Sequence, residues 1–558
     1  MSMLVASGLV MLGPVVIGRA IDAVDRGTSR SELAQYFGIL LMLAVVEGFL
    51  RFLARNTING TSRRVEYAMR DDMARQFMRL DQSFYIRSQT GDLMARCTND
   101  IQRVRDLAGP ATVEIGRALT YLVIGFIFML TIDVTLALIA VAYFPVIAIV
   151  MGRFRQPVER KYREVQDQFG ELANRVQENI SGIRAIKAYA QEDSETETFA
   201  IANRELMRRT MNWAVYMGAF WPLMIFCAGA SVVLVLWFGG RAVVAGEMTV
   251  GQFVQFLSYL AILSAPLMSV GWTLTMAQQG LASLRRVTEV FLAEPLISDP
   301  ENEKHINEPR GEIEFRNVSF SYYDEPVLSE VNLTIPAGAT AALVGSTGAG
   351  KTTLVNLLVR LHDPTEGQVL LDGVDIRDLP LQELRELIGF VPQETFLFSE
   401  SLRDNVALSR EDALDADLDY AVETSQLVND LPQLTHGIET VLGERGVTLS
   451  GGQKQRTALA RALLKAPPIV VLDDALSHVD THTEEEILRR LHDFMKQRTT
   501  IIIAHRTSTL RAADFIVALE ANRIAEIGTH DELLALGRVY ANFYRRQLLW
   551  SRLRAISV

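Results

Sequence analysis

The residues best suited to chemistry begin with a glycine-rich run, GSTGAGKT, from Gly345 to Thr352. A glycine-rich turn that opens a helix directs backbone N–H groups at the phosphates of a nucleotide. The Lys351 ammonium can reach the terminal phosphates, and the Thr352 hydroxyl can ligate Mg²⁺. The sequence therefore predicts a site for ATP and Mg²⁺. The candidate nucleotide-binding residues of this run and of the position that follows it are Gly345, Thr347, Gly348, Ala349, Gly350, Lys351, Thr352 and Thr353.

Four later segments carry further groups that such a site can use. The apolar run 468–472 predicts a fully buried parallel strand, and Asp473 follows at its end, where a carboxylate can hold Mg²⁺. The glycine-rich run alone is a moderate signal, but in this order the whole set is very specific for one kind of ATP site. The remaining members are Gln393, the run LSGGQ at 449–453, Asp474, and His505 after the apolar run 500–504.

Composition divides the chain into two unlike halves. Its 558 residues are 49% hydrophobic, yet 22% are charged, and the mean hydropathy is +0.16. These values indicate a membrane protein with an attached soluble domain. The net charge of −11 gives no support to nucleic-acid binding, and two cysteines exclude a disulfide scaffold.

The first half contains six apolar stretches, each near the ~20 residues that a membrane-spanning helix needs. Arginine-dense segments separate the second from the third stretch and the fourth from the fifth, which predicts that both lie in the cytoplasm. We therefore expect a multi-pass protein of the inner (cytoplasmic) membrane with its ATPase in the cytoplasm. An unbroken helix from about 35 to 80 would span roughly 65 Å and project far beyond the bilayer. The stretches are 1–20, 35–54, 114–132, 134–152, 214–239 and 251–275.

Together these motifs resemble the exporter-type ATP-binding cassette (ABC) half-transporter. The segment 83–93 resembles the first intracellular turn of that family, and 186–192 resembles the run leading to the second. The resemblance implies an all-α six-helix transmembrane domain with long cytoplasmic helical extensions, followed by an α/β P-loop ABC ATPase domain. The chain departs from the family in the length of its first span. Only 13 residues precede Pro14, so this span looks shortened. The expected parts are a transmembrane domain at 1–280, a linker at 281–311 and a nucleotide-binding domain at 312–558.

The resemblance also implies roles for single residues. Tyr322 would stack on adenine, although the residues alone are compatible with an ordinary strand tyrosine. Gln393 and Asp473 would join Thr352 around Mg²⁺. The signature residues would face the γ-phosphate of ATP that is bound to an opposite cassette, so a second half-transporter subunit is required. These signature residues are Ser450, Gly451, Gly452 and Gln453.

Asp474 stands where the family usually has a catalytic glutamate. Its side chain is one methylene shorter, and losing a well-placed general base typically costs 10²–10⁴ in rate, so slow hydrolysis is expected at this site. His505 would steady the γ-phosphate, and His478 is a second departure that can also be neutral variation. The chain resembles the degenerate-site (Asp-containing) subunit of bacterial heterodimeric multidrug exporters, paired with a different chain that carries the glutamate. A slow homodimer is the alternative.

The transported compound is not specified by the residues. The expected function is ATP-driven export of hydrophobic or amphipathic compounds, with a homodimeric lipid flippase of the same fold as the alternative. An ATP-gated channel is a further alternative. Six spans and the acidic balance exclude a non-transporting ATPase that acts on nucleic acid or the ribosome. Glu47 and Arg51, four residues apart on the second span, are either a candidate contact site for cationic compounds or an intrahelical ion pair. An adaptable binding surface or ordinary packing would account for Met217, Met224, Met268, Met276, Trp221 and Trp272.

Overall fold

The computed structural model describes residues 2–323, 325–443, 446, 449–503, 510–511 and 513–556. Within these ranges, several helical side chains at 143–155, 220–228 and 265–270, that of residue 481 and those from 550 onward are not described. The chain divides into two compact units. The first comprises Met1–Gln76 and Gly91–Leu292, and the second comprises Phe77–Thr90 and Ala293–Val558.

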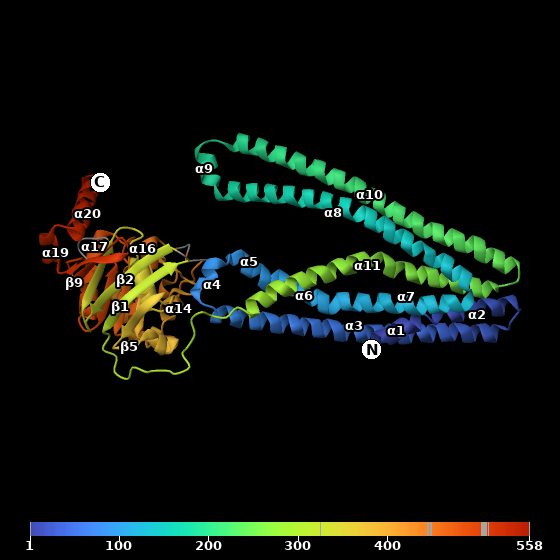
Figure 1. Ribbon diagram of the computed structural model, residues 1–558, viewed down its shortest axis with the longest axis horizontal. Coiled ribbons are helices and arrows are strands. Elements are labelled where there is room, and N and C mark those ends of the chain that lie inside the picture. Colours follow the sequence, from blue (N-terminus) through green and yellow to red (C-terminus); the bar gives the residue numbers. More distant parts are fainter. Residues whose placement is uncertain are drawn as a thin grey trace. The chain divides into compact units, whose positions relative to one another are not determined.

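The first unit is built from long helices, and its arrangement is visible in Figure 1. The short helix α9 lies at one end of a hairpin in which α8 packs along α10. The helices are α1 (Ser2–Val10), α2 (Gly13–Asp25), α3 (Arg30–Arg79), α5 (Thr90–Ala95), α6 (Ile101–Asp106), α7 (Thr112–Ile132), α8 (Val134–Ser181), α9 (Ile183–Ala188), α10 (Glu192–Val244) and α11 (Val250–Phe291). Two π-helical turns, η1 (Arg96–Asp100) and η2 (Leu107–Ala111), flank α6.

Among the described residues, three helical segments are long and apolar enough to cross a membrane: Ser2–Asp25, Arg30–Arg79 and Thr90–Ile132. Shorter apolar helical segments occur at Gly229–Val244 and Val250–Ser264. The 50-residue α3 confirms the prediction of an unbroken helix from about 35 to 80. At 1.5 Å per residue its length is about 75 Å, more than twice the hydrocarbon core of a bilayer.

The first span bends between α1 and α2, just before Pro14. A proline cannot donate a backbone hydrogen bond within a helix, which favours a break one turn earlier. The carbonyl of Met11, at the bend, accepts a hydrogen bond of 2.8 Å from the buried hydroxyl of Tyr259 on α11. The bend is therefore fixed by a contact between the first and last helices of the unit.

A close crossing of α2 and α11 holds the other end of this span. The Asp22 carboxylate accepts hydrogen bonds from the Thr249 hydroxyl (2.8 Å) and from the Gly251 N–H (2.7 Å) at the start of α11. A Cβ added at Gly251 would lie 2.0 Å from the carbonyl oxygen of Gly18. Only glycine allows the two backbones to approach this closely.

The second unit contains two sheets. A four-stranded antiparallel sheet has the order β2-β1-β4-β5, and a six-stranded, mainly parallel sheet has the order β10-β9-β3-β8-β7-β6. The strands are β1 (Ile313–Tyr322), β2 (Glu325–Ile335), β3 (Thr340–Gly345), β4 (Glu366–Leu371), β5 (Val374–Asp375), β6 (Ile388–Val391), β7 (Ile469–Asp473), β8 (Thr499–Ile503), β9 (Phe515–Glu520) and β10 (Arg523–Gly528).

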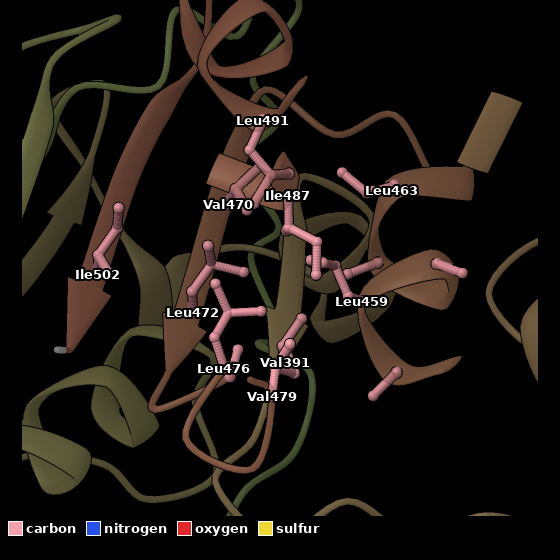
Figure 2. Close-up of a cluster of buried hydrophobic side chains, with 14 of the residues drawn as sticks. Val391, Leu459, Leu463, Val470, Leu472, Leu476, Val479, Ile487, Leu491 and Ile502 are labelled. Atoms are coloured by element: carbon pink, nitrogen blue, oxygen red, sulfur yellow. The ribbon is translucent and has the colours of Figure 1, made fainter. Parts of the chain in front are cut away.

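Helices pack around these sheets. The main ones for the site are α12, which follows β3, and α16, which precedes β7. Figure 2 shows side chains of β6, β7, α16 and α17 meeting in one buried apolar cluster. The helices of this unit are α4 (Gln82–Arg87), α12 (Lys351–Leu358), α13 (Leu381–Glu386), α14 (Leu402–Ala407), α15 (Asp415–Thr424), α16 (Gly451–Leu464), α17 (Thr481–Met495), α19 (His530–Leu536) and α20 (Val539–Ile556).

The segment Phe77–Thr90 belongs by its contacts to the second unit, although α3 connects it to the first. Asp81 caps α4 by accepting a hydrogen bond from the Ser83 N–H (2.9 Å), and its other oxygen accepts one from the Leu296 N–H (2.6 Å). The Arg87 guanidinium lies 5.8 Å from the centre of the Tyr323 ring, within cation–π range. The predicted first intracellular turn therefore contacts the strand end that follows Tyr322.

The close crossing of α2 and α11 generates a stability prediction. Gly251→Ala forces a methyl group against backbone atoms of α2, and overpacking of this kind costs about 1–3 kcal/mol. We expect a lowered melting temperature of the purified protein in detergent. The matched control is Gly240→Ala, because a Cβ at Gly240 on α10 meets nothing within 4 Å. Equal melting temperatures for the two variants would show that the crossing is not tight.

Candidate functional site

The site is organised by four adjacent strands of the six-stranded sheet. β3, β8, β7 and β6 are neighbours and run parallel. Their registers pair Leu343 with Ile503, Ile503 with Asp473, and Leu472 with Val391. The carboxyl ends of all four strands therefore lie along one edge of the sheet, where ligands bind in open α/β sheets.

The glycine-rich run follows β3 and leads into α12, as the sequence predicts. Gly350, the N-cap of α12, has a left-handed φ of +94°. A Cβ there would lie 2.8 Å from the Val327 carbonyl oxygen, so a side chain is excluded. Gly348 is also left-handed (φ +82°), and a Cβ there would meet nothing within 4 Å. The loop thus presents open backbone beside a helix N-terminus, an arrangement that suits phosphate groups.

Lys351 is buried inside this loop, with 7% of its surface exposed. Its Nζ donates to the carbonyl oxygens of Gly345 and Ser346, at 2.9 Å each. Burial lowers the pKa of Lys351, and the carboxylates of Asp473 and Asp474 oppose that shift. Lys351 therefore lies within electrostatic range of both strand-end acids.

The predicted magnesium ligands offer a suitable donor set. Thr352 presents an exposed hydroxyl at the first turn of α12, Gln393 is exposed just beyond β6, and Asp473 ends β7 with 1% of its surface exposed. A hydroxyl, an amide carbonyl and a carboxylate are all oxygen ligands, the type that Mg²⁺ prefers. These residues would hold the ion against the nucleotide phosphates, whose charge it would neutralise.

Asp474 lies directly beyond β7 in a constrained conformation. Its φ is +48°, and its N–H donates to the Ile503 carbonyl at 3.1 Å. Aspartate is enriched among non-glycine residues in this left-handed region. The backbone position is thus fixed by β8, so the length of the side chain decides how far the carboxylate reaches.

The signature run begins α16 with a capping box. The Ser450 hydroxyl oxygen accepts a hydrogen bond from the Gln453 N–H (3.3 Å), and the Gln453 amide oxygen accepts one from the Ser450 N–H (2.9 Å). Gly451 is exposed at the first helical position, whereas Gly452 is buried. This exposed helix N-terminus has the dipole sign that favours an anion.

A buried ion pair supports the signature, and sequence reasoning missed it. Arg456 donates two hydrogen bonds to the Asp430 carboxylate, at 2.7 and 2.8 Å, and both side chains are at most 11% exposed. The Gln453 side-chain amide also donates to Asp430, at 3.3 Å. The S-x-x-Q spacing could have revealed the capping box, but nothing near Asp430 in the sequence marks it as a partner.

A second missed residue is Gln455, which joins α16 to the segment after Asp474. Its Nε2 donates to the Asp474 carbonyl (3.3 Å) and to the Ser477 hydroxyl (2.9 Å), and its Oε1 accepts the His478 N–H (2.9 Å). A Cβ added at Gly451 would lie 3.3 Å from ring atoms of His478. The signature and the strand-end acids are therefore held in one connected structure.

Tyr322 and His505 complete the set of predicted site residues. Tyr322 ends β1 and packs edge-on against Phe320 and His362, with ring centres 4.8 and 5.4 Å apart. Stacking of the Tyr322 ring on adenine stays a prediction. His505 lies outside the described residues. On α3, Glu47 and Arg51 form the intrahelical ion pair that was the simpler prediction for them.

Comparisons with known proteins agree with this organisation. The family model of the ABC transporter transmembrane region matches residues 1–267, and the ABC transporter model matches residues 328–477. A probable multidrug resistance ABC transporter ATP-binding/permease protein of Bacillus subtilis (strain 168) is 35% identical over 552 residues, which cover 97% of this chain and 93% of the relative.

Further similarities extend over the whole chain. An ATP-dependent lipid A-core flippase of Syntrophus aciditrophicus (strain SB) is 34% identical over 550 residues, covering 98% of this chain and 94% of the relative. The solved structure of a bacterial Atm1-family ABC exporter with ATP bound matches with a TM-score of 0.81 and 26% identity, covering 98% and 96% of the two chains.

The predicted fold class and the predicted ATPase activity coupled to transport are thereby confirmed. The sheet edge carries the residues predicted to form the phosphate loop and the acids, and the helical unit contains the transmembrane region. This chain belongs to the ABC transporter family, as an exporter half-transporter in which a helical transmembrane domain is fused to an α/β nucleotide-binding domain.

Proposed function

We propose that this chain is one half of a heterodimeric exporter that uses ATP to move hydrophobic or amphipathic compounds across the cytoplasmic membrane. Its own Lys351, Asp473 and Asp474, with a partner's signature, form the slow ATP site. Its intact signature, beginning at Ser450, completes the fast site on a partner that carries the catalytic glutamate. ATP and Mg²⁺ are the cofactors, and the membrane and a second, unlike half-transporter are the partners.

The observation that carries this proposal is the position of Asp474. Its backbone is fixed by the hydrogen bond to Ile503, so the missing methylene is not offset by a shift of the chain. A shorter side chain leaves its carboxylate about one bond length back from an attacking water, and general-base catalysis depends on hydrogen-bond reach. Left-handed backbone alone also favours aspartate, which is why the length of this side chain has to be tested directly.

A second subunit is supported by the tip of the α8–α10 hairpin. Ile180 is 69% exposed and Tyr189 is 77% exposed there, with Ile183 of α9 exposed between them. Large apolar side chains gathered at one exposed tip indicate a protein-binding surface. In a dimeric exporter, the natural occupant is the nucleotide-binding domain of the other subunit.

A homodimeric lipid flippase is the second candidate, because relatives named ATP-dependent lipid A-core flippase match nearly the whole chain. Transport assays in reconstituted vesicles distinguish the two functions. An exporter moves an amphipathic dye across the bilayer, whereas a flippase moves a labelled lipid from one leaflet to the other. The exporter proposal fails if ATP drives lipid movement and no dye is transported.

Lys351→Ala should weaken ATP binding at the site of this chain. Charge-assisted hydrogen bonds contribute about 1.5–3 kcal/mol, so we expect a roughly 10- to 100-fold loss of affinity. Photoaffinity labelling with azido-ATP reports the occupancy of each subunit separately. Lys496→Ala is the control, because this exposed lysine pairs only with Asp493 among the described residues. An unchanged labelling curve for Lys351→Ala would mean that the phosphate loop is assigned wrongly.

Changes at Asp474 separate side-chain length from charge. Asp474→Asn should alter ATP turnover of the assembled transporter little, because this site already contributes little. Asp474→Glu should raise turnover, by about twofold at most, since a second working site would join the first. Both variants are measured in the purified complex beside the glutamate-to-glutamine variant of the partner, which should nearly abolish turnover. Near-complete loss in Asp474→Asn would contradict the slow-site assignment.

The signature should matter more than the carboxylate of this chain. Ser450→Asp keeps a good helix cap but places a negative charge where the γ-phosphate of the partner's ATP docks. An unfavourable interaction of about 1–4 kcal/mol at close range predicts at least a roughly fivefold loss of ATPase activity.

Ser450→Asn is the matched control, because asparagine has the same size as aspartate and also caps a helix but carries no charge. It should retain far more activity than Ser450→Asp. Two equivalent sites in a homodimer predict comparable damage from Asp474→Asn and Ser450→Asp, and that result would overturn the asymmetric proposal.

A further inference from the structure

A cavity of about 500 Å³ lies within the transmembrane unit, between α11 and the helical segment that contains α6. Its wall on α11 includes Trp272, Met276 and Gln279, and its opposite wall includes Gln102 and Arg103. Cavities of this size hold small organic molecules. Sequence reasoning noticed Trp272 and Met276 but could not place them beside an arginine that lies about 170 residues earlier in the chain.

The cavity has a rigid frame. The π-helical turns η1 and η2 bracket α6, and such turns occur frequently at functional sites. Gly280 closes one side, because a Cβ there would lie 2.6 Å from the Leu107 side chain and 3.0 Å from the Arg103 carbonyl oxygen. On the same side, Arg286 and Ser283 of α11 hydrogen-bond to the buried Asp100 carboxylate of η1. The walls are thus held at a fixed separation.

The lining of this cavity contains one cation, Arg103, and one carboxylate, Asp106. Among the described residues, Arg103 has no salt bridge within 4 Å, and its side chain is exposed to the cavity. Both nearby carboxylates are engaged by other arginines. Asp100 accepts two hydrogen bonds from Arg286, and Asp106 accepts two from Arg105, at 3.1 and 2.7 Å. The charge of Arg103 therefore lacks a close ion-pair partner.

The other polar groups of the cavity suit an anion as well. Asn99, Gln102 and Gln279 each carry amide N–H groups that can donate to the oxygens of a bound carboxylate, sulfonate or phosphate. The acidic residue of the lining, Asp106, is paired with Arg105.

The remaining wall is apolar. The Trp272 side chain is 71% exposed, and Met276 lies one helical turn further along the same face of α11. An indole ring offers a flat apolar surface, and a thioether adapts to different shapes. This wall fits the planar or aliphatic body of a molecule whose charged end lies at Arg103.

From this arrangement we propose that the cavity is a binding site for amphipathic anions, with Arg103 holding the anionic group and Trp272 the apolar body. This inference rests on the proposed export function and names the class of compound that is exported. A cationic amphiphile of the same shape is disfavoured, because its charge would face the unneutralised guanidinium. The anion is either a soluble amphiphile or the head group of an anionic lipid, since both present the same chemistry.

The test uses two probes that differ in the sign of their charge, pyrenebutyrate and pyrenebutyl-trimethylammonium. Binding to the purified full transporter in phosphatidylcholine nanodiscs is followed by energy transfer from tryptophan to pyrene. We expect the anion to bind at least about tenfold more tightly than the cation. Arg103→Gln should lower anion affinity about 10- to 100-fold and leave cation affinity unchanged, and Arg103→Glu should reverse the preference.

Two control variants match these changes. Arg285→Gln removes an exposed arginine of α11 that does not line the cavity, and it should leave both affinities unchanged. Trp272→Phe should lower the energy transfer to the bound anion more than Trp237→Phe, which alters an exposed tryptophan on α10.

Adding phosphatidylglycerol to the nanodiscs identifies the source of the anion. Competition that depends on Arg103 indicates a lipid head group, and no competition indicates a soluble amphiphile.

Equal binding of the two probes, or equal effects of Arg103→Gln and Arg285→Gln, would overturn the proposed site while leaving the export function intact. The converse is also distinguishable. If anion binding depends on Arg103 but ATP drives no transport of any probe, the export function is wrong and the binding site stands.

Discussion

The parallel hydrogen-bond register of β3, β8, β7 and β6 is the constraint on which the nucleotide site depends. It aligns the carboxyl ends of four strands, so the phosphate loop after β3 and the acids after β7 lie at one edge although more than 120 residues separate them. The buried cluster in Figure 2 holds that register, because β6 and β7 pack their apolar side chains against α16 and α17. A one-residue slip would turn Asp473 away from Lys351.

Helix α16, which packs in the same cluster, also joins the signature to the segment after the strand-end acids. Gln455 on α16 hydrogen-bonds to the segment after Asp474, and Asp430 anchors the first turn of α16 through Arg456. In the proposed heterodimer, the acids would serve the nucleotide of this chain, whereas the signature would serve a nucleotide on the partner. Because the connection between them is rigid, a slow site at Asp474 would leave the geometry of the signature intact, as the proposed asymmetric pair of sites requires.

How much the sequence could predict depended on the range of each contact. The phosphate loop and the end of β7 were predictable, since each follows from local composition and a buried run. The length of α3 was predictable from its unbroken helical pattern. By contrast, Asp100 meets Arg286 across 186 residues, and no periodicity marks either one. The cavity beside Arg103 and the π-helical turns also arise from packing between distant helices, so they became visible only in three dimensions.

The central claim, that this chain works beside an unlike subunit, is tested most directly by its native partner. The tagged chain is extracted from native membranes, and the intact complex is analysed by native mass spectrometry with identification of each subunit. The account predicts one copy of this 62.2 kDa chain bound to one different half-transporter whose sequence has glutamate at the position that corresponds to Asp474. A complex that contains two copies of this chain and no other transporter subunit would contradict it.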